Sequence, residues 1–181
     1  ETFALGALMC LHAARLPVRV DEGGELSPLL QQDRARWDGA LVAQGLALLE
    51  RSASGTALTA YHIEAAIAAA HASAPSALEV DWATVVSLYD RLMILAPSPV
   101  VALNRAIAIG QRDGADRGLE ALRAIEDARR FDRYPFHAAA LGDFEMRRGN
   151  AIDARDHFTA ALARARNPAE RRFFERKLST P

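Results

Sequence analysis

The chain has 181 residues, of which 50% are hydrophobic and 25% are charged, and its formal net charge is -1 at pH 7. This length and apolar content allow a real core, in one large domain or a short solenoid. The near-neutral charge argues against recruitment to nucleic acid or to an anionic membrane by bulk electrostatics. The single cysteine, Cys10, excludes an internal disulfide and a multi-cysteine zinc site, and it fits the reducing cytoplasm where we expect the protein.

The first half of the chain predicts three helices separated by polar turns. Residues 1–17 form an apolar run without a basic leader, too short for a convincing membrane span, so a buried helix is expected. Because this run begins in what looks like mid-helix, we expect the chain to be a C-terminal fragment of a longer protein. A second helix is predicted from about 31–51, with Trp37 on its buried side, and a third from about 59–73.

The second half predicts paired helices. Asp81 is a candidate N-cap for a helix that ends before Pro97 and pairs weakly with the helix at 59–73. The clearest helical hairpin covers residues 134–168, with its turn at Gly149. A second copy carries Gly114 at the turn, 35 residues earlier, close to the period of about 34 residues of tetratricopeptide repeats.

The small residues of these repeats let two helices approach closely, and Phe158 is expected to fill the space between adjacent hairpins. Asn167 is the N-cap candidate of a final capping helix that turns Phe173 and Phe174 inward. No segment alternates with period two for long enough to indicate a sheet. We therefore predict an all-α, tetratricopeptide-like helical-hairpin array of about nine helices. It forms one domain over 1–181, with an N-terminal helical part (1–57) followed by repeat-like hairpins and a capping helix (58–181).

No catalytic or cofactor motif stands out. The five histidines form no metal-ligand pattern, and the chain has no glycine-rich phosphate loop and no nucleophile elbow. We therefore expect no enzyme activity, no cofactor and no metal.

Two polar clusters could carry binding. Residues 31–38, QQDRARWD, place Arg34 and Asp38 four residues apart beside an indole; an intrahelical ion pair with a core tryptophan is favoured over a ligand site. Asn104 and Arg105 interrupt an apolar helix, where they either grip a peptide or bond to the neighbouring helix.

Several phrases resemble the C-terminal extension of one group of bacterial extracytoplasmic-function sigma factors of the sigma-70 family. They are QQDRARWD (31–38), YHIEAAIAAAHA (61–72), DWATVVSLYDRL (81–92), SPVVALNRAIA (98–108) and AERRFFERKL (169–178). SPVVALNRA is the most specific of these. His62 stands where the family favours glutamine, a change that can alter partner contacts without altering the fold.

The resemblance implies that sigma regions upstream of Glu1 bind the promoter and core polymerase. This domain would then be a regulatory or protein-interaction module without direct DNA or membrane binding. Its partners would be its own sigma regions, RNA polymerase or a signalling protein. The predicted partner-binding residues are Asp33, Arg36, His62, Glu64, Asn104 and Arg105. The competing interpretation is a free-standing tetratricopeptide adaptor that clamps a peptide of an unrelated partner.

Overall fold

The computed structural model describes residues 1–21, 23–55, 57–126 and 128–179. Within these ranges the chain contains nine α-helices and no strand, which confirms the predicted all-α class. The contacts fall into two compact units. Unit 1 comprises Glu1–Gly23 and Ser27–Pro97, and unit 2 comprises Gly24–Leu26 and Ser98–Pro181.

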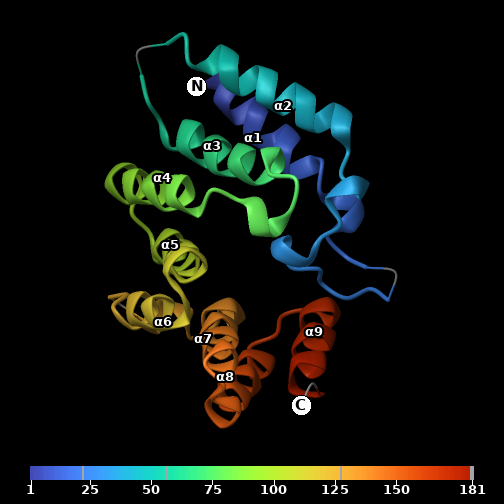
Figure 1. Ribbon diagram of the computed structural model, residues 1–181, viewed down its shortest axis with the longest axis vertical. Coiled ribbons are helices and arrows are strands. Elements are labelled where there is room, and N and C mark those ends of the chain that lie inside the picture. Colours follow the sequence, from blue (N-terminus) through green and yellow to red (C-terminus); the bar gives the residue numbers. More distant parts are fainter. Residues whose placement is uncertain (22, 56, 127, 180–181) are drawn as a thin grey trace. The chain divides into compact units, whose positions relative to one another are not determined.

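Unit 1 is built from four helices, of which α1 packs against α2 and α3, and α3 packs against α4 (Figure 1). Short 3₁₀ turns connect them. The α-helices are α1 (Thr2–Ala13), α2 (Gly39–Ser52), α3 (Ala60–Ser73) and α4 (Trp82–Leu95), and the 3₁₀ turns are η1 (Leu16–Val18), η2 (Leu29–Gln31), η3 (Arg34–Arg36) and η4 (Ala77–Glu79). The Asp81 carboxylate accepts the Thr84 backbone N–H at 3.0 Å, which confirms the predicted cap of α4.

The predicted second helix is shorter than the sequence suggested, because it begins at Gly39. The Asp33 carboxylate accepts the backbone N–H of Ala35, and the Asp38 carboxylate accepts that of Leu41, both at 3.0 Å. Each aspartate therefore ends one local turn and starts the next, which competes with a continuous helix. The predicted intrahelical pair between Arg34 and Asp38 is wrong, since the two residues do not share a helix.

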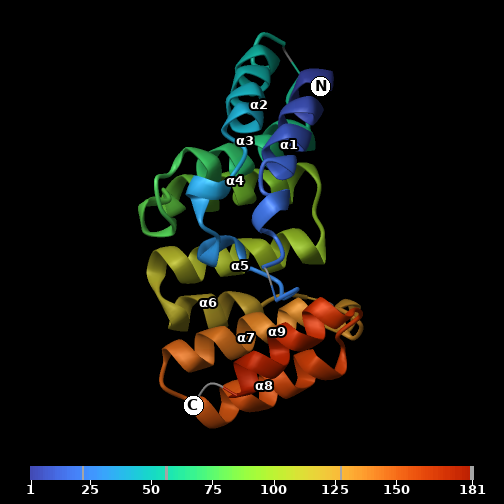
Figure 2. The same ribbon diagram turned by 90° about the vertical axis from the view of Figure 1, so that its right-hand side faces the viewer.

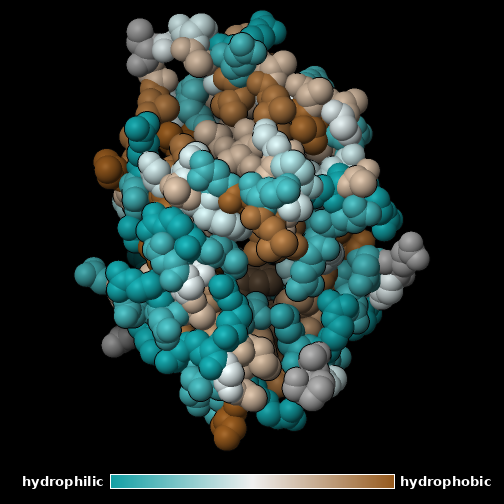
Figure 3. Space-filling view, in the orientation of Figure 1, coloured by the Kyte–Doolittle hydropathy of each residue, from teal (hydrophilic) through white to brown (hydrophobic). Residues whose placement is uncertain are grey.

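Helix α1 is apolar around most of its circumference. Ala4, Ala7 and Leu11 are buried, and the Leu11 side chain packs on Gly45 of α2, where a Cβ would come within 2.7 Å of Leu11 Cγ. Met9 is exposed, and Figure 3 shows apolar side chains gathered over α1 and α2 on the face drawn there. Among the described residues, no helix has the length and apolar character needed to cross a membrane.

Unit 2 is built from two helical hairpins and a last helix that packs on the second hairpin (Figure 2). The first hairpin pairs α5 with α6, and the second pairs α7 with α8. The elements are α5 (Pro99–Asp113), α6 (Ala115–Arg123), η5 (Ala128–Phe131), α7 (Pro135–Arg147), α8 (Ala151–Ala163) and α9 (Pro168–Ser179). The hairpins predicted around Gly114 and Gly149 are therefore confirmed.

The two turn glycines share a positive φ. Gly114 has φ = 96° and Gly149 has φ = 82°, both in the region that favours glycine, and a Cβ on either would meet no atom of the described residues within 4 Å. Backbone geometry, and not space, therefore explains why glycine recurs at this interval.

Other glycines of unit 2 provide space for aromatic rings. Phe144 of α7 lies against Gly110 of α5 and Gly118 of α6, so this ring fills the space between the two hairpins. Phe158 of α8 packs on Gly142 within its own hairpin, where a Cβ would come within 2.7 Å of the ring. The role predicted for Phe158 between hairpins thus belongs to Phe144.

We expect Gly118→Ala to destabilise unit 2. The new Cβ would come within 2.6 Å of the Phe144 ring and 2.9 Å of Gly110 Cα, and the ring is only 2% exposed. Overpacking costs about 3 kcal/mol and the better helix propensity of alanine returns about 1 kcal/mol, so the net loss is about 2 kcal/mol in urea unfolding. Gly39→Ala is the matched control because nothing lies within 4 Å of its Cβ position. Equal stabilities of the two variants would contradict this packing.

The last helix caps the array through both apolar and polar contacts. Asn167 Oδ1 accepts the Glu170 N–H at 2.9 Å, which confirms its predicted N-cap role. Phe173 and Phe174 are buried together with Ala161, as predicted. The Lys177 Nζ forms an ion pair with Asp143 at 2.7 Å and lies 5.6 Å from the ring centroid of Phe158.

Candidate functional site

The structure places the predicted partner-binding residues as three local pairs. Asp33 and Arg36 are exposed at η3, and His62 and Glu64 lie on α3, in unit 1. Asn104 and Arg105 are neighbours on α5, in unit 2. The exposed or half-buried members are Asp33, Arg36, Glu64, Asn104 and Arg105, whereas His62 is buried.

His62 has a local structural role. Its Nδ1 accepts the Thr59 backbone N–H at 3.1 Å, and the Thr59 hydroxyl lies 2.9 Å from the same nitrogen. This is a capping box at the start of α3, in which the third helical residue is usually glutamate or glutamine. A histidine can therefore replace glutamine here because its ring nitrogen is also an acceptor.

A second group of polar side chains surrounds Trp37, which is only 8% exposed. We call it the Trp37 cluster; its members are Arg15, Gln32, Arg34, Trp37 and His71. The Arg34 and Arg15 guanidiniums lie 5.4 and 5.6 Å from the centroid of the Trp37 ring. Such cation–aromatic contacts stabilise both groups, and they also confirm the expected core position of the tryptophan.

Hydrogen bonds orient the two arginines of the cluster. Arg34 Nη1 donates to the carbonyl oxygens of His71 and, at 2.7 Å, Ala74, at the end of α3. Arg15 Nε donates to Gln32 Oε1 at 3.2 Å, and Gln32 Nε2 donates to the Ser27 carbonyl at 2.8 Å. These bonds join the segment 27–38 to the turn that follows α1 and to the end of α3. Residues 31–38 therefore present Asp33 and Arg36 outward while Gln32, Arg34 and Trp37 point inward.

The cluster concentrates positive charge. Burial, followed by the charges of Arg34 and Arg15, lowers the pKa of His71 from 6.5 to about 4, so its ring is neutral at pH 7. Burial and then the charges of Arg19 and Arg34 lower the pKa of Arg15. Burial also lowers the pKa of Arg34, against the smaller opposing effect of the Glu79 carboxylate. Like charges held this close cost free energy unless something offsets them.

Three buried nitrogens of this cluster lack a hydrogen-bond partner among the residues that the structure describes: Arg34 Nη2, Trp37 Nε1 and His71 Nδ1. Buried polar atoms without a partner are rare in folded proteins. Sequence reasoning identified the 31–38 segment but missed Arg15 and His71. No local pattern marks these two residues, because Arg15 follows α1 and His71 lies on α3, both far from residues 31–38 in sequence.

One buried carboxylate of unit 2, that of Glu145, has a structural explanation. Glu145 is 1% exposed and accepts from Asn150 Nδ2 and Arg123 Nη2 at 2.8 Å, and from Arg148 Nη1 at 3.1 Å. The Asn150 bond, with the Arg148 and Arg123 charges, lowers the pKa of this carboxyl below its ordinary value. The network fixes the α7–α8 turn and leaves no free group for chemistry. Among the described residues, no group of histidine, cysteine, aspartate and glutamate side chains could hold a metal ion.

Comparison with known proteins places the first part of the chain in context. Residues 1–53 match a family of unknown function, DUF6596. The chain is 33% identical over 178 residues to an uncharacterised protein of Rhizobium meliloti (strain 1021), an alignment that covers 98% of this chain and 42% of that protein. The chain thus spans less than half the length of this relative. No solved structure matches this chain significantly.

Proposed function

We propose that this chain is the regulatory, protein-interaction part of an extracytoplasmic-function sigma factor that acts in the cytoplasm and has no enzyme activity of its own. One observation carries the proposal: four of the five phrases that resemble the sigma-factor extension coincide with helices of the all-α fold, namely α3, α4, α5 and α9. Residues 1–53 of the chain match DUF6596, a domain found in sigma-factor-like proteins. The Rhizobium relative is more than twice as long as the aligned region, which leaves room in that protein for promoter-binding regions.

The candidate contact residues follow from exposure and form two sets, one in each unit. Asp33, Arg36 and Glu64 in unit 1 are polar residues of the resembling phrases that reach solvent, and so are Asn104 and Arg105 in unit 2. His62 is buried and stabilises the start of α3 by accepting the Thr59 backbone N–H, so we do not propose it as a partner contact. We propose that these residues bind the factor's own sigma regions, RNA polymerase or a signalling protein. The near-neutral charge supports a partner other than DNA.

The proposal predicts that a full-length factor lacking residues 1–181 loses activation of its target promoter. A reporter gene under that promoter measures this, with an immunoblot to show equal levels of the two forms. Undiminished activation by the truncated factor would show that the proposal is wrong. In that case the free-standing peptide adaptor, which the hairpins of unit 2 also suit, becomes the better interpretation.

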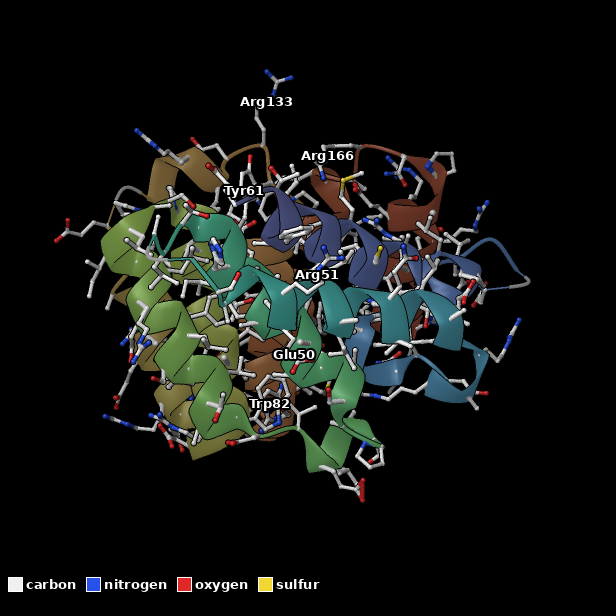
Figure 4. The ribbon with its side chains drawn as sticks, turned by 90° about the horizontal axis from the view of Figure 1, so that it is seen from above. Glu50, Arg51, Tyr61, Trp82, Arg133 and Arg166 are labelled. Atoms are coloured by element: carbon white, nitrogen blue, oxygen red, sulfur yellow. The ribbon has the colours of Figure 1, made fainter. Side chains whose placement is uncertain are left out.

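Point variants test the candidate contact residues of unit 2 separately. Asn104→Ala with Arg105→Ala is expected to reduce activation while the melting temperature stays nearly unchanged. Arg133→Ala is the matched control, because Arg133 is exposed, lies outside the resembling phrases and extends away from the ribbon (Figure 4). A large fall in melting temperature of the double variant would instead assign the pair to the core.

A further inference from the structure

The unpartnered atoms of the Trp37 cluster share one chemical property. A guanidinium and an indole N–H can only donate hydrogen bonds, and His71 Nδ1 donates in one of its tautomers. The cluster therefore holds three buried nitrogens that can all donate and that have no hydrogen-bond partner within the described residues. Within the described part of the chain, no carboxylate forms an ion pair with Arg15 or Arg34.

A negatively charged acceptor would accept hydrogen bonds from these nitrogens and would also offset the positive charge of the two arginines. Gln32 accepts a hydrogen bond only from the Nε–H of Arg15, so the Nη groups of this arginine can donate to a ligand. Carbonyl oxygens accept the hydrogen bonds of Arg34 Nη1, whereas Arg34 Nη2 has no hydrogen-bond partner among the described residues. Planar guanidiniums with fixed orientation suit the oxygens of carboxylates and phosphates. A water molecule could accept only two of the three donor groups and would not offset the charge of the arginines.

We propose that the Trp37 cluster binds a small oxyanion, a carboxylate or inorganic phosphate, with Arg34 Nη2, Trp37 Nε1–H and His71 Nδ1–H as donors and Arg15 as the second cation. The burial of Trp37 and His71, each 8% exposed, favours a small ligand over a protein segment. Arg34 is half-buried, so the anion would enter the cluster from the side where this arginine reaches solvent. This inference is independent of the proposed sigma-factor role.

The indole N–H of Trp37 offers a direct readout of binding. Its resonance in a proton–nitrogen NMR spectrum of the 181-residue chain is distinguished from that of Trp82 by a Trp82→Phe variant; Trp82 stands at the start of α4 (Figure 4). Titration with sodium phosphate, and separately with sodium acetate, is made at constant ionic strength with sodium chloride. We expect a saturable shift with a Kd of about 1 mM or tighter. A response to phosphate alone identifies phosphate, and a response to acetate alone, or to both anions, identifies a carboxylate-accepting site.

Variants separate a built site from general charge effects. Arg34→Gln and Arg15→Gln are each expected to weaken binding about tenfold or more. Arg51→Gln is the matched control, because Arg51 is an exposed cation of unit 1 that stacks on another ring, Phe3, at 4.3 Å. The melting temperature of every variant is measured, and Arg15→Gln decides the question if Arg34→Gln fails to fold.

Two results would overturn the proposal. One is the absence of a saturable shift of the Trp37 resonance with either anion. The other is an equal response in the Arg51→Gln, Arg34→Gln and Arg15→Gln variants, which would mean that the anions act only by screening charge.

Discussion

Replacement of Phe158 by alanine is expected to lower the free energy of unfolding of unit 2 by about 4 kcal/mol. The ring is 1% exposed, and it occupies the space that Gly142 leaves on the facing helix. Lys177 of α9 lies 5.6 Å from its centroid, so the same ring joins the second hairpin to the last helix. Alanine would remove the apolar area and leave a cavity that the glycine beside it cannot fill.

The measurement is urea unfolding followed by circular dichroism. The matched control is Phe3→Ala in unit 1, whose ring is 41% exposed, and we expect it to lose less than about 1 kcal/mol. A third variant, Gly142→Ala, should also destabilise, because its Cβ would come within 2.7 Å of the Phe158 ring. If Phe158→Ala and Phe3→Ala lost the same stability, the central position of Phe158 would be refuted.

Acidification is expected to destabilise unit 1 through His71. The pKa of this ring is about 4 in the folded chain, because of burial and then the charges of Arg34 and Arg15, against 6.5 as the ordinary value. The unfolded chain therefore binds a proton below pH 6.5 that the folded chain excludes until about pH 4. The stabilisation is complete above 6.5 and falls by about 1.4 kcal/mol per pH unit below it, to a total loss of about 3 kcal/mol.

Urea unfolding at several pH values, together with the NMR titration of the His71 ring protons, measures this effect. In a His71→Gln variant the slope between about pH 6.5 and pH 5 should decrease. The contributions of His12 and His137, whose pKa values burial also lowers, remain, as does the titration of carboxylates at lower pH. Identical slopes in the variant and the parent chain would contradict the assignment. Bound phosphate should raise the pKa of His71, which connects this experiment to the proposed oxyanion site.

The parts of the fold that sequence predicted correctly are those with local causes. Asp81 and Asn167 cap helices through their own side chains, and Gly114 and Gly149 permit the backbone conformation of the two turns. The prediction of a helix over residues 31–38 was wrong, and the reason is also local. Its spacing fits a helix, but Asp33 and Asp38 each cap a separate turn, and a period count does not weigh that competition.

The Trp37 cluster lay beyond sequence reasoning because its cause is tertiary. Arg15 follows an apolar helix and His71 ends another, and only the folding of unit 1 brings both beside Trp37. The wrong prediction that Phe158 lies between the hairpins, where Phe144 lies instead, has a similar origin. Both phenylalanines fit the repeat pattern, and the position of the glycines on the facing helices decides which ring fills which space.

The pairing of Lys177 with Asp143 beside Phe158 has a practical consequence, since Lys177 is the only lysine of the chain. An acylating dye directed at lysine would attach at a single internal position without any engineered cysteine. It would report from the contact between α9 and the second hairpin. The same reaction would remove the positive charge that Asp143 pairs with, so labelling yield and the integrity of the C-terminal helix would be linked.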